Sequence, residues 1–406
     1  MNTPAPTSPR TNPRMAVVVS CIALFTDMLI YGILIPLLPL MPAVERAGSS
    51  ATGLLFAAYA AMMIAVTPLA GRLVDRKGTR GPLLAALLGL AAACLLFAVG
   101  GPYWLLLISR LLQGAAAGLG WVASLALIAA SIPLERRGTY LGLAMSMVSI
   151  GTLAGPPLAG WLARDHGHAA PFVLAAAVLI LDGVLRVVFV RPTPPSADDP
   201  ATPLDVLRVG GSWPVVILIA VGSAVTSAIE PILPVRLAVG LGLDTAGIGL
   251  LFALLVIIGA VLNPMVGAIL NRVSPRVLAL IGAALAIAGL LLLGAGSRLP
   301  VVIAGIVCLG GAIAFLVAPA GTLIGVQGAR TTPPALGGAY SLYNLAYAAG
   351  LTAGPALAGL LTSVLGYPAA CTALAAGVAV VAFGGLGRLP RRLSAPEAAG
   401  SQSLSR

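Results

Sequence analysis

The sequence contains few charged and few aromatic side chains for its length. Charged residues make up 9% of the 406 residues and aromatic residues 5%, whereas 59% are hydrophobic. Soluble globular proteins carry about a quarter charged residues, which cover their surface. Together with a mean hydropathy of +1.05, this composition excludes a water-soluble globule and predicts a protein that lies in a lipid bilayer.

Sequence signals for enzymatic and cofactor chemistry are also missing. Cys21, Cys94, Cys308 and Cys371 lie singly in apolar segments, without metal-ligand spacing or a disulfide framework. The sequence contains no Walker loop, no nucleophile elbow and no cluster of His and Cys. We therefore expect no enzymatic activity, no cofactor and no metal, and any uphill transport must use an ion gradient rather than ATP.

Apolar runs account for most of the chain. They cover residues 15–42, 50–70, 82–100, 103–131, 139–163, 169–190, 213–239, 246–270, 277–296, 299–326, 337–365 and 368–387. A helix of about 20 apolar residues crosses a hydrocarbon layer of about 30 Å. These runs predict an all-α membrane protein with twelve transmembrane helices.

Two pairs of similar segments indicate an internal duplication. GRLVDRKGTR (71–80) has a weaker copy, GAILNRVSPR (267–276), and AGPPLAG (154–160) recurs as AGPALAG (353–359). Repeated halves in a membrane protein are typical of secondary transporters. We predict two pseudo-symmetric six-helix halves around a central cavity, at 15–190 and 213–387. A disordered tail (1–14), a Pro-rich linker (191–212) and a C-terminal tail (388–406) complete the chain.

The net charge of +11 comes from basic residues spread over loops, not from a basic surface of the kind that binds nucleic acid. In the twelve-span arrangement, loops on one side carry most of the arginines, and the opposite loops carry only Arg46, Arg164 and Arg298. Positively charged loops remain on the cytoplasmic side. This bias predicts an inner-membrane protein with both termini in the cytoplasm and no nucleic-acid partner.

Three carboxylates fall inside apolar runs, and two have features that indicate proton binding. Asp27 lies deep in the first run, and Arg110 lies at about the same depth, so we expect the two to interact and Arg110 to help set when Asp27 holds a proton. The alternative is a permanent structural ion pair. Glu230 precedes Pro231 in a Pro-interrupted run, which indicates a second proton site or a structural carboxylate. Asp182 has Arg186 four residues on, the spacing of an ion pair, which is either structural or has a role in transport.

Two further segments carry candidate residues. Tyr340, Tyr343 and Tyr347 form a helical stripe beside Asn344, either a ligand wall or helix packing. In the 71–80 loop, Asp75 stands among basic residues, between Gly71 and Gly78, which permit close approach and a tight turn. We predict that this loop gates the cytoplasmic face; the alternative is a basic loop that only sets topology.

These segments resemble the motifs of the major facilitator superfamily and its twelve-span drug:proton antiporters. FTDMLIYGILIPLLP (25–39) is similar to their first-span motif and SRLLQGAAAG (109–118) to their fourth-span motif. The matching residues of the loop motif are Gly71, Leu73, Asp75, Arg76, Gly78 and Arg80, and those of the fifth-span antiporter motif are Gly142, Gly151, Gly155, Pro156 and Gly160. The resemblance covers nearly the whole chain and implies export in exchange for protons. We expect the substrate cavity to include Tyr31, Tyr59, Gln113, Tyr343, Asn344 and Tyr347.

A closer similarity is to vesicular monoamine transporters and their bacterial relatives. It rests on Asp27, LLF (54–56), LDG (181–183) and IEPILP (229–234). This chain has Tyr59 where those transporters carry a second-span lysine, and Val317 and Asn344 where they carry aspartates. The substitutions argue against a specifically amine substrate.

The sequence thus predicts a monomeric, proton-coupled exporter of a small, partly lipophilic compound such as a drug or secondary metabolite. Two alternatives remain. One is a proton symporter for nutrient uptake, and the other is a membrane receptor or scaffold that keeps a transporter fold without flux.

Overall fold

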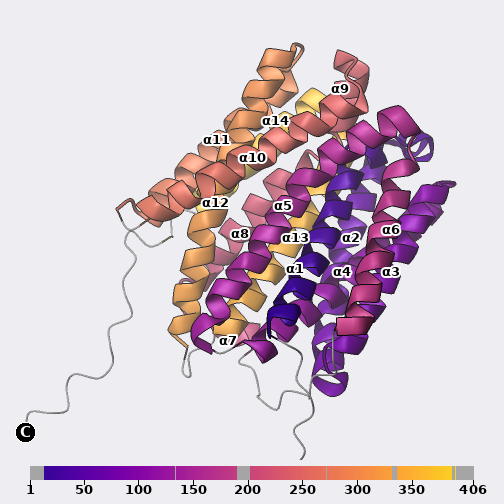
Figure 1. Ribbon diagram of the computed structural model, residues 1–406. Helices are drawn as coiled ribbons and strands as arrows, with labels where there is room; N and C mark the ends of the chain where they lie inside the picture. Colours follow the sequence, from indigo (N-terminus) through magenta and orange to yellow (C-terminus); the bar gives the residue numbers. More distant parts are fainter. Residues whose placement is uncertain are drawn as a thin grey trace, which may run out of the picture. The chain divides into compact units, whose positions relative to one another are not determined.

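The computed structural model describes residues 13–132, 134–189, 202–270, 272–331, 336–385 and 389, and every regular element in these ranges is a helix (Figure 1). The first part of the chain forms α1 (Pro13–Leu37), the 3-10 turn η1 (Leu38–Leu40), α2 (Pro42–Lys77), α3 (Arg80–Val99), α4 (Tyr103–Ser131), α5 (Leu134–His166) and α6 (Ala170–Phe189). The second part forms α7 (Pro203–Leu207), α8 (Ser212–Ala228), α9 (Leu233–Leu241), α10 (Thr245–Ile269), α11 (Pro275–Ala295), α12 (Leu299–Ala329), α13 (Leu336–Leu365) and α14 (Tyr367–Gly384).

The helices match the predicted membrane spans. Within the described ranges, 11 helical segments are long and apolar enough to cross a bilayer, and α8 and α9 together supply one of them. The sixth predicted span corresponds to α6, whose apolar stretch Ala170–Val184 is shorter. The all-α fold class of a multi-pass membrane protein is confirmed.

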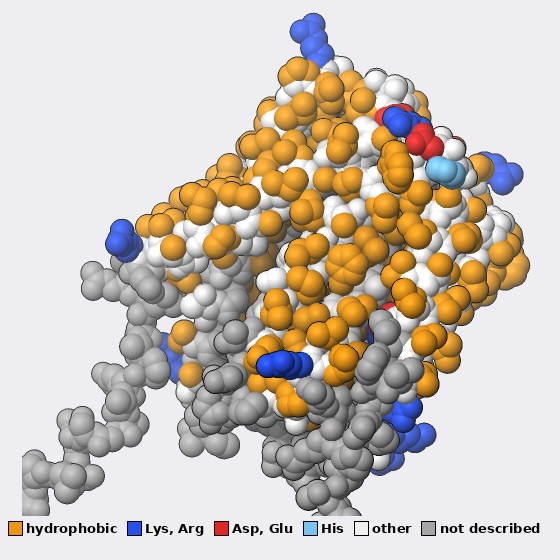
Figure 2. Space-filling model, viewed as in Figure 1, with side chains coloured by type: hydrophobic (Ala, Val, Ile, Leu, Met, Phe, Trp, Pro, Cys, Tyr) orange, Lys and Arg blue, Asp and Glu red, His pale blue; other side chains and the backbone are white. Residues whose placement is uncertain are grey.

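Side chains on the outside of the helices suit a lipid environment. Large apolar side chains such as Val99, Val364 and Phe383 are 78%, 72% and 89% exposed. Figure 2 shows that hydrophobic side chains cover most of the visible face, while Lys and Arg side chains gather near helix ends. Such a surface would aggregate in water, but in a bilayer it contacts acyl chains.

Local sequence sets where the helices begin and end. Pro42 and Pro275 begin α2 and α11, and the Ser274 hydroxyl caps α11 by accepting a bond from the Val277 amide at 3.2 Å. The short helix α7 lies outside the predicted spans. There, hydrogen bonds from Thr202 to the Asp205 carboxylate hold the pKa of Asp205 below its ordinary value.

The duplicated AGPPLAG and AGPALAG segments occupy equivalent places in the fold. Gly155 of α5 packs against the backbone of Gly32 in α1, and Gly354 of α13 packs in the same way against Ala224 in α8. The fifth helix of each half therefore crosses the first at a point where only a hydrogen atom fits. The repeat in sequence corresponds to a repeat in helix packing.

The chain divides into two compact units. Unit 1 comprises Met1–Asp198 and Leu233–Ala253, and unit 2 comprises Asp199–Ile232 and Leu254–Arg406. The chain passes between them in the break between α8 and α9, and again within α10. The predicted boundaries of the two halves remain a prediction.

Candidate functional site

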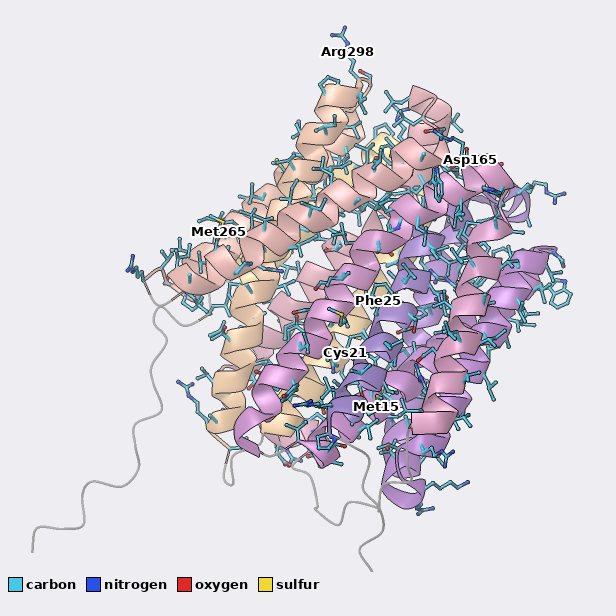
Figure 3. The ribbon with its side chains drawn as sticks, in the orientation of Figure 1. Met15, Cys21, Phe25, Asp165, Met265 and Arg298 are labelled. Atoms are coloured by element: carbon cyan, nitrogen blue, oxygen red, sulfur yellow. The ribbon has the colours of Figure 1, made fainter. Side chains whose placement is uncertain are left out.

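Asp27 is a buried carboxylate in the middle of α1. Met15, Cys21 and Phe25 mark the course of this helix in Figure 3, and Asp27 follows two residues after Phe25. Only 4% of Asp27 is exposed. Its Oδ2 atom accepts a hydrogen bond of 2.8 Å from the Trp121 indole nitrogen of α4, and the Tyr59 hydroxyl of α2 lies within interaction range of the same carboxylate. The direct hydrogen-bond donor to Asp27 is therefore a neutral group.

Arg110 of α4 is fully buried, and its guanidinium group lies among three aromatic rings that come from α1 and α2. Its guanidinium carbon lies 4.6 Å from the Phe56 ring centroid, 5.5 Å from that of Tyr59 and 5.6 Å from that of Tyr31. The Gln113 side-chain oxygen accepts a hydrogen bond from Arg110 Nη1 at 2.9 Å. Three ring faces and one amide oxygen compensate for the buried positive charge.

Tyr59 links the two charged residues. Its ring faces Arg110, and its hydroxyl lies beside Asp27. The structure thus brings the predicted residues Asp27, Tyr31, Tyr59, Arg110 and Gln113 together in unit 1. Direct interaction between Arg110 and Asp27 stays a prediction, because the hydrogen bonds above join each of them to another residue.

The role of Trp121 was not predicted from the sequence. Trp121 lies 11 residues after Arg110, about three helical turns, so both residues fall on one face of α4. From that spacing, Trp121, whose indole can donate a hydrogen bond, could have been placed on the same helix face as Arg110. The signal is weak without knowing that α1 lies opposite.

Glycines hold the helices of this site close together. In the fourth-span motif, Gly114 lies against the backbone of Tyr59, and Gly118 lies against Met63. In the fifth-span motif, Gly151 lies against the backbone of Phe25, and Pro156 lies against Gly32. The motif glycines therefore hold α4 against α2 and α5 against α1.

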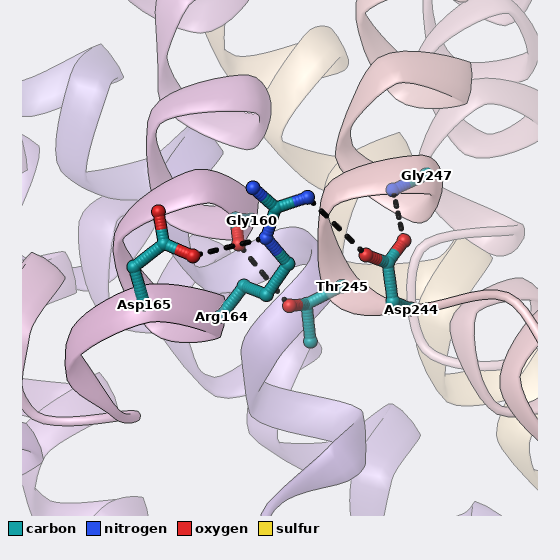
Figure 4. Close-up of polar contacts among 6 residues, drawn as sticks. All are labelled: Gly160, Arg164, Asp165, Asp244, Thr245 and Gly247. Carbon is teal, nitrogen blue, oxygen red and sulfur yellow. Dashed lines mark hydrogen bonds and ion pairs between the residues drawn. The ribbon is translucent and has the colours of Figure 1, made fainter.

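The last motif residue, Gly160, packs elsewhere. It lies against Thr245 and Ala246 at the start of α10, and the Thr245 hydroxyl donates to the Gly160 carbonyl at 3.2 Å (Figure 4). Beside it, Arg164 Nη1 lies 3.9 Å from Asp244 Oδ2. Asp244 also caps α10, because its Oδ1 accepts from the Gly247 amide at 2.8 Å. The end of α5 is thus joined to the start of α10 by a polar, exposed contact.

In unit 2, Glu230 lies in the break between α8 and α9. The prolines Pro231 and Pro234 follow it, as the sequence predicted for an interrupted span, and Glu230 is only 5% exposed. Its carboxylate interacts electrostatically with Tyr347, whose ring stacks on Tyr343 with centroids 6.1 Å apart. Glu230 therefore interacts with one of two stacked tyrosines that the sequence analysis predicted.

The tyrosine stripe is divided. Tyr340 is 54% exposed and lines an open groove of about 610 Å³ with Val317, Gly321 and Gly325 of α12. Asn344 is also exposed. The groove is walled mainly by apolar and small side chains.

The 71–80 loop is described in part. Gly78 ends α2 with φ of 73°, a conformation that favours glycine, while Gly71 has open space around it and Arg76 is exposed. Arg80 Nη2 donates to the Val187 carbonyl of α6 at 3.0 Å. The Asp75 side chain lies outside the described residues, so the gating role of this loop stays a prediction.

Asp182 and Arg186 form the predicted ion pair within α6, and both are buried. Arg186 Nη1 also donates to the Leu83 carbonyl at 3.2 Å, which joins α6 to α3. In the part of the chain that the structure describes, no group of three or more His, Cys, Asp or Glu could hold a metal ion.

Comparison with known proteins decides the family. The family model of the Major Facilitator Superfamily matches residues 20–327 and 215–404. The chain belongs to the Major Facilitator Superfamily. It is a multi-pass membrane protein, and its family is one of transporters rather than enzymes, as the motifs predicted.

Solved structures of other superfamily members share the fold. A bacterial homologue of the human lysosomal transporter Spinster, in an inward-facing and unoccupied conformation, matches with a TM-score of 0.74 over 93% of this chain and 94% of its own, at 15% identity. The human organic anion transporter MFSD10 matches with a TM-score of 0.65 over 92% of this chain and 99% of its own, at 22% identity. At these identities the likeness shows the fold alone.

Curated relatives confirm the resemblance to vesicular transporters. A probable vesicular acetylcholine transporter-B of Danio rerio is 35% identical over 193 residues, which is 45% of this chain and 39% of that protein. The human chromaffin granule amine transporter is 26% identical over 323 residues, 78% of this chain and 61% of that protein. In both cases the match spans less than two thirds of the relative's length.

Proposed function

We propose that this superfamily transporter exports a small, partly lipophilic compound in exchange for protons and that Asp27 is the principal proton-binding residue. The supporting observation is the burial of Asp27 with a neutral indole as its direct hydrogen-bond donor. A carboxylate bonded directly to a buried cation would leave that cation uncompensated when it is protonated. Because the Trp121 indole is neutral, no buried cation loses its counter-charge when Asp27 is protonated.

Arg110 supports this role from its position among the three aromatic rings. Because three aromatic rings and Gln113 stabilise its charge, Arg110 remains a fixed cation whatever the state of Asp27. Through Tyr59 it favours the ionised form of Asp27 and so helps set when the proton leaves. Glu230, beside Tyr347, is proposed as the second proton site.

The substrate surface is proposed to include the exposed side chains of unit 2. Tyr31, Tyr59 and Gln113 are buried around Arg110, whereas Asn344 is exposed and Tyr343 and Tyr347 are partly exposed. The mainly apolar groove beside Tyr340 suits a compound with substantial hydrophobic surface. The named relatives include amine and acetylcholine transporters, so a lipophilic cation is the natural first test compound.

Cellular placement follows from the same proposal. The arginine bias supports an inner-membrane protein with both termini in the cytoplasm. A single chain carries both proposed proton sites, Asp27 and Glu230, and the tyrosines beside them. We therefore propose that the protein transports as a monomer.

The test uses the purified full chain in liposomes with an imposed pH gradient. Ethidium, a permanent cation that cannot be trapped by protonation, and neutral chloramphenicol serve as probes, with protein-free liposomes as control. Antiport predicts accumulation in the acidic compartment and loss of accumulation when nigericin collapses the gradient. Accumulation in the alkaline compartment would instead show symport, and absence of flux for either probe would favour a non-transporting role.

A further inference from the structure

A small cavity lies beside Asp27 inside unit 1. It measures about 20 Å³ and is enclosed by α1, α3, α4 and α6. Its polar lining residues are Asp27, Trp121 and Arg186, and its remaining lining is apolar, with Gly120 on α4. A cavity of more than about 15 Å³ with polar partners can hold one water molecule.

Two residues that line this cavity, Asp27 and Arg186, and Asp182, the ion-pair partner of Arg186, each have a buried polar atom that can accept or donate a further hydrogen bond. Among the described residues, Asp27 Oδ1, Asp182 Oδ1 and Arg186 Nε have no hydrogen-bond partner. Such atoms are costly to bury unless water satisfies them. The cavity therefore connects Asp27 to the buried ion pair of α6, which the proposed function above does not use.

We propose that a water molecule in this cavity connects Asp27 to Asp182 and Arg186 and that Asp182 accepts the proton of Asp27 on its way to the end of α6. This inference rests on the proposed function and adds a second carboxylate to it. The spacing within α6 favours the direction, because Arg186 lies three residues from the end of the helix and Asp182 lies one turn deeper.

The transfer conserves charge. The Asp27 carboxyl loses its proton to the water, which passes a proton to the Asp182 carboxylate, so one protonated and one ionised carboxyl exist before and after. Arg186 stays protonated throughout and pairs with whichever carboxylate is ionised. The cluster thus never holds two uncompensated negative charges.

Other groups around Asp27 do not supply an alternative acceptor. Tyr59 approaches from α2, Cys94 from α3 and the neutral Trp121 from α4, while α5 presents the backbone of Gly151. A phenol and a thiol titrate well above a carboxyl group. Arg110 lies behind Tyr59 as a fixed cation.

The proposed path from Asp27 through the water to Asp182, called the relay below, ends near a residue of the 71–80 loop motif. Arg80, the last residue of that motif, bonds the Val187 carbonyl, and Arg186 bonds the Leu83 carbonyl. The two arginines therefore hold α3 and α6 together where the proposed relay ends.

Trp121 provides a probe that needs no substrate. The chain has four tryptophans, and the other three, Trp104, Trp161 and Trp213, are 60%, 54% and 61% exposed. Replacing those three by Phe leaves Trp121, whose indole bonds Asp27, as the only indole fluorophore. The full chain in nanodiscs is titrated with pH, and the emission of Trp121 is followed at equilibrium and after a rapid pH jump.

The inference predicts opposite shifts for the two members of the pair. Asp182→Asn leaves Arg186 wholly available to Asp27 and moves the titration midpoint down by about one pH unit, and Arg186→Gln moves it up by about one unit. Asp27→Asn abolishes the titration. If a single variant does not fold, Asp182→Asn/Arg186→Gln removes both charges together, and it is expected to titrate near the wild-type midpoint with a slower pH-jump response.

A cavity-filling pair tests the water. A Cβ atom at Gly120 meets nothing closer than the Ala86 Cβ at 3.4 Å, so Gly120→Ala fits and narrows the cavity. It should slow the pH-jump response on the order of tenfold. Gly81→Ala adds a methyl group in open space on α3 and should leave the response unchanged.

The relay is overturned if both charge variants keep the wild-type midpoint, if Gly120→Ala responds as fast as Gly81→Ala, or if the titration persists in Asp27→Asn. These results leave the proposed function standing, because that function is decided separately by gradient-driven transport in liposomes.

Discussion

The indole nitrogen of Trp121 donates a 2.8 Å hydrogen bond to the carboxylate of Asp27, which joins α4 to α1 deep inside unit 1. A donor of this kind stabilises the ionised carboxylate, so it contributes to the pH at which the transporter exchanges its proton.

Removing that donor should shift the pH dependence of transport. Trp121→Phe keeps an aromatic ring but removes the bond, so Asp27 stays protonated to higher pH. We expect the midpoint of gradient-driven ethidium transport to rise by about one pH unit, the equivalent of one hydrogen bond to a charged group. Trp104→Phe, at a 60% exposed position, is the matched control and should leave the midpoint in place.

Tyr59 should carry the influence of Arg110 to Asp27. Arg110→Ala removes a buried cation and is expected to raise the same midpoint. Tyr59→Phe keeps the ring that faces Arg110 and removes the hydroxyl beside Asp27. In a double-mutant cycle, the effect of Arg110→Ala should shrink in the Tyr59→Phe background, whereas additive shifts would show that the two residues act independently.

The crossing of α5 on α1 should not tolerate a methyl group. A Cβ atom at Gly155 would lie 2.6 Å from the Leu29 carbonyl oxygen and from the Gly32 Cα. Gly155→Ala should therefore destabilise the protein by about 1–3 kcal/mol, which a thermal melt in detergent would detect. Gly377→Ala, in α14 with open space around it, should melt like the wild type. Equal melting of the two variants would mean that the helices separate without cost.

The contact between α5 and α10 should open during transport. A transporter that exposes its site alternately to the two sides must release contacts at one end in each cycle. With the native cysteines replaced, Arg164→Cys together with Asp244→Cys should be joined by a bifunctional thiol reagent that forms reducible links. A linker is needed because the long Arg164 side chain brings its Nη1 atom to 3.9 Å from Asp244, and two cysteines are too short for a direct disulfide. The link should stop most transport, and its reduction should restore transport. Full activity of the cross-linked protein would exclude movement at this contact.

The loop motif predicts a kinetic rather than a binding defect. Asp75→Asn should slow transport severalfold and change substrate affinity little, because it biases the two global states at a distance from the binding site. Binding and turnover measured on the same preparation separate these effects. A loss of affinity equal to the loss of rate would place Asp75 in the binding site instead.

Sequence reasoning succeeded where the relevant contact lies within one helix. The spacing of Asp182 and Arg186 fixes their distance once a helix forms, and Pro231 and Pro234 determine the break beside Glu230. It failed where the contact depends on how two helices are rotated against each other. The bond from Trp121 to Asp27, the packing of Gly160 on α10 and the separation of Tyr340 from Tyr343 and Tyr347 all depend on that rotation, which composition and spacing do not determine.

The proton role of Asp27 is tested most directly by comparing two modes of transport in one variant. Asp27→Asn keeps the shape of the side chain but cannot exchange a proton. The variant should still exchange labelled ethidium for unlabelled ethidium across liposomes without a pH gradient, and it should not accumulate ethidium when a gradient is imposed. Accumulation at the wild-type level in Asp27→Asn would contradict the account.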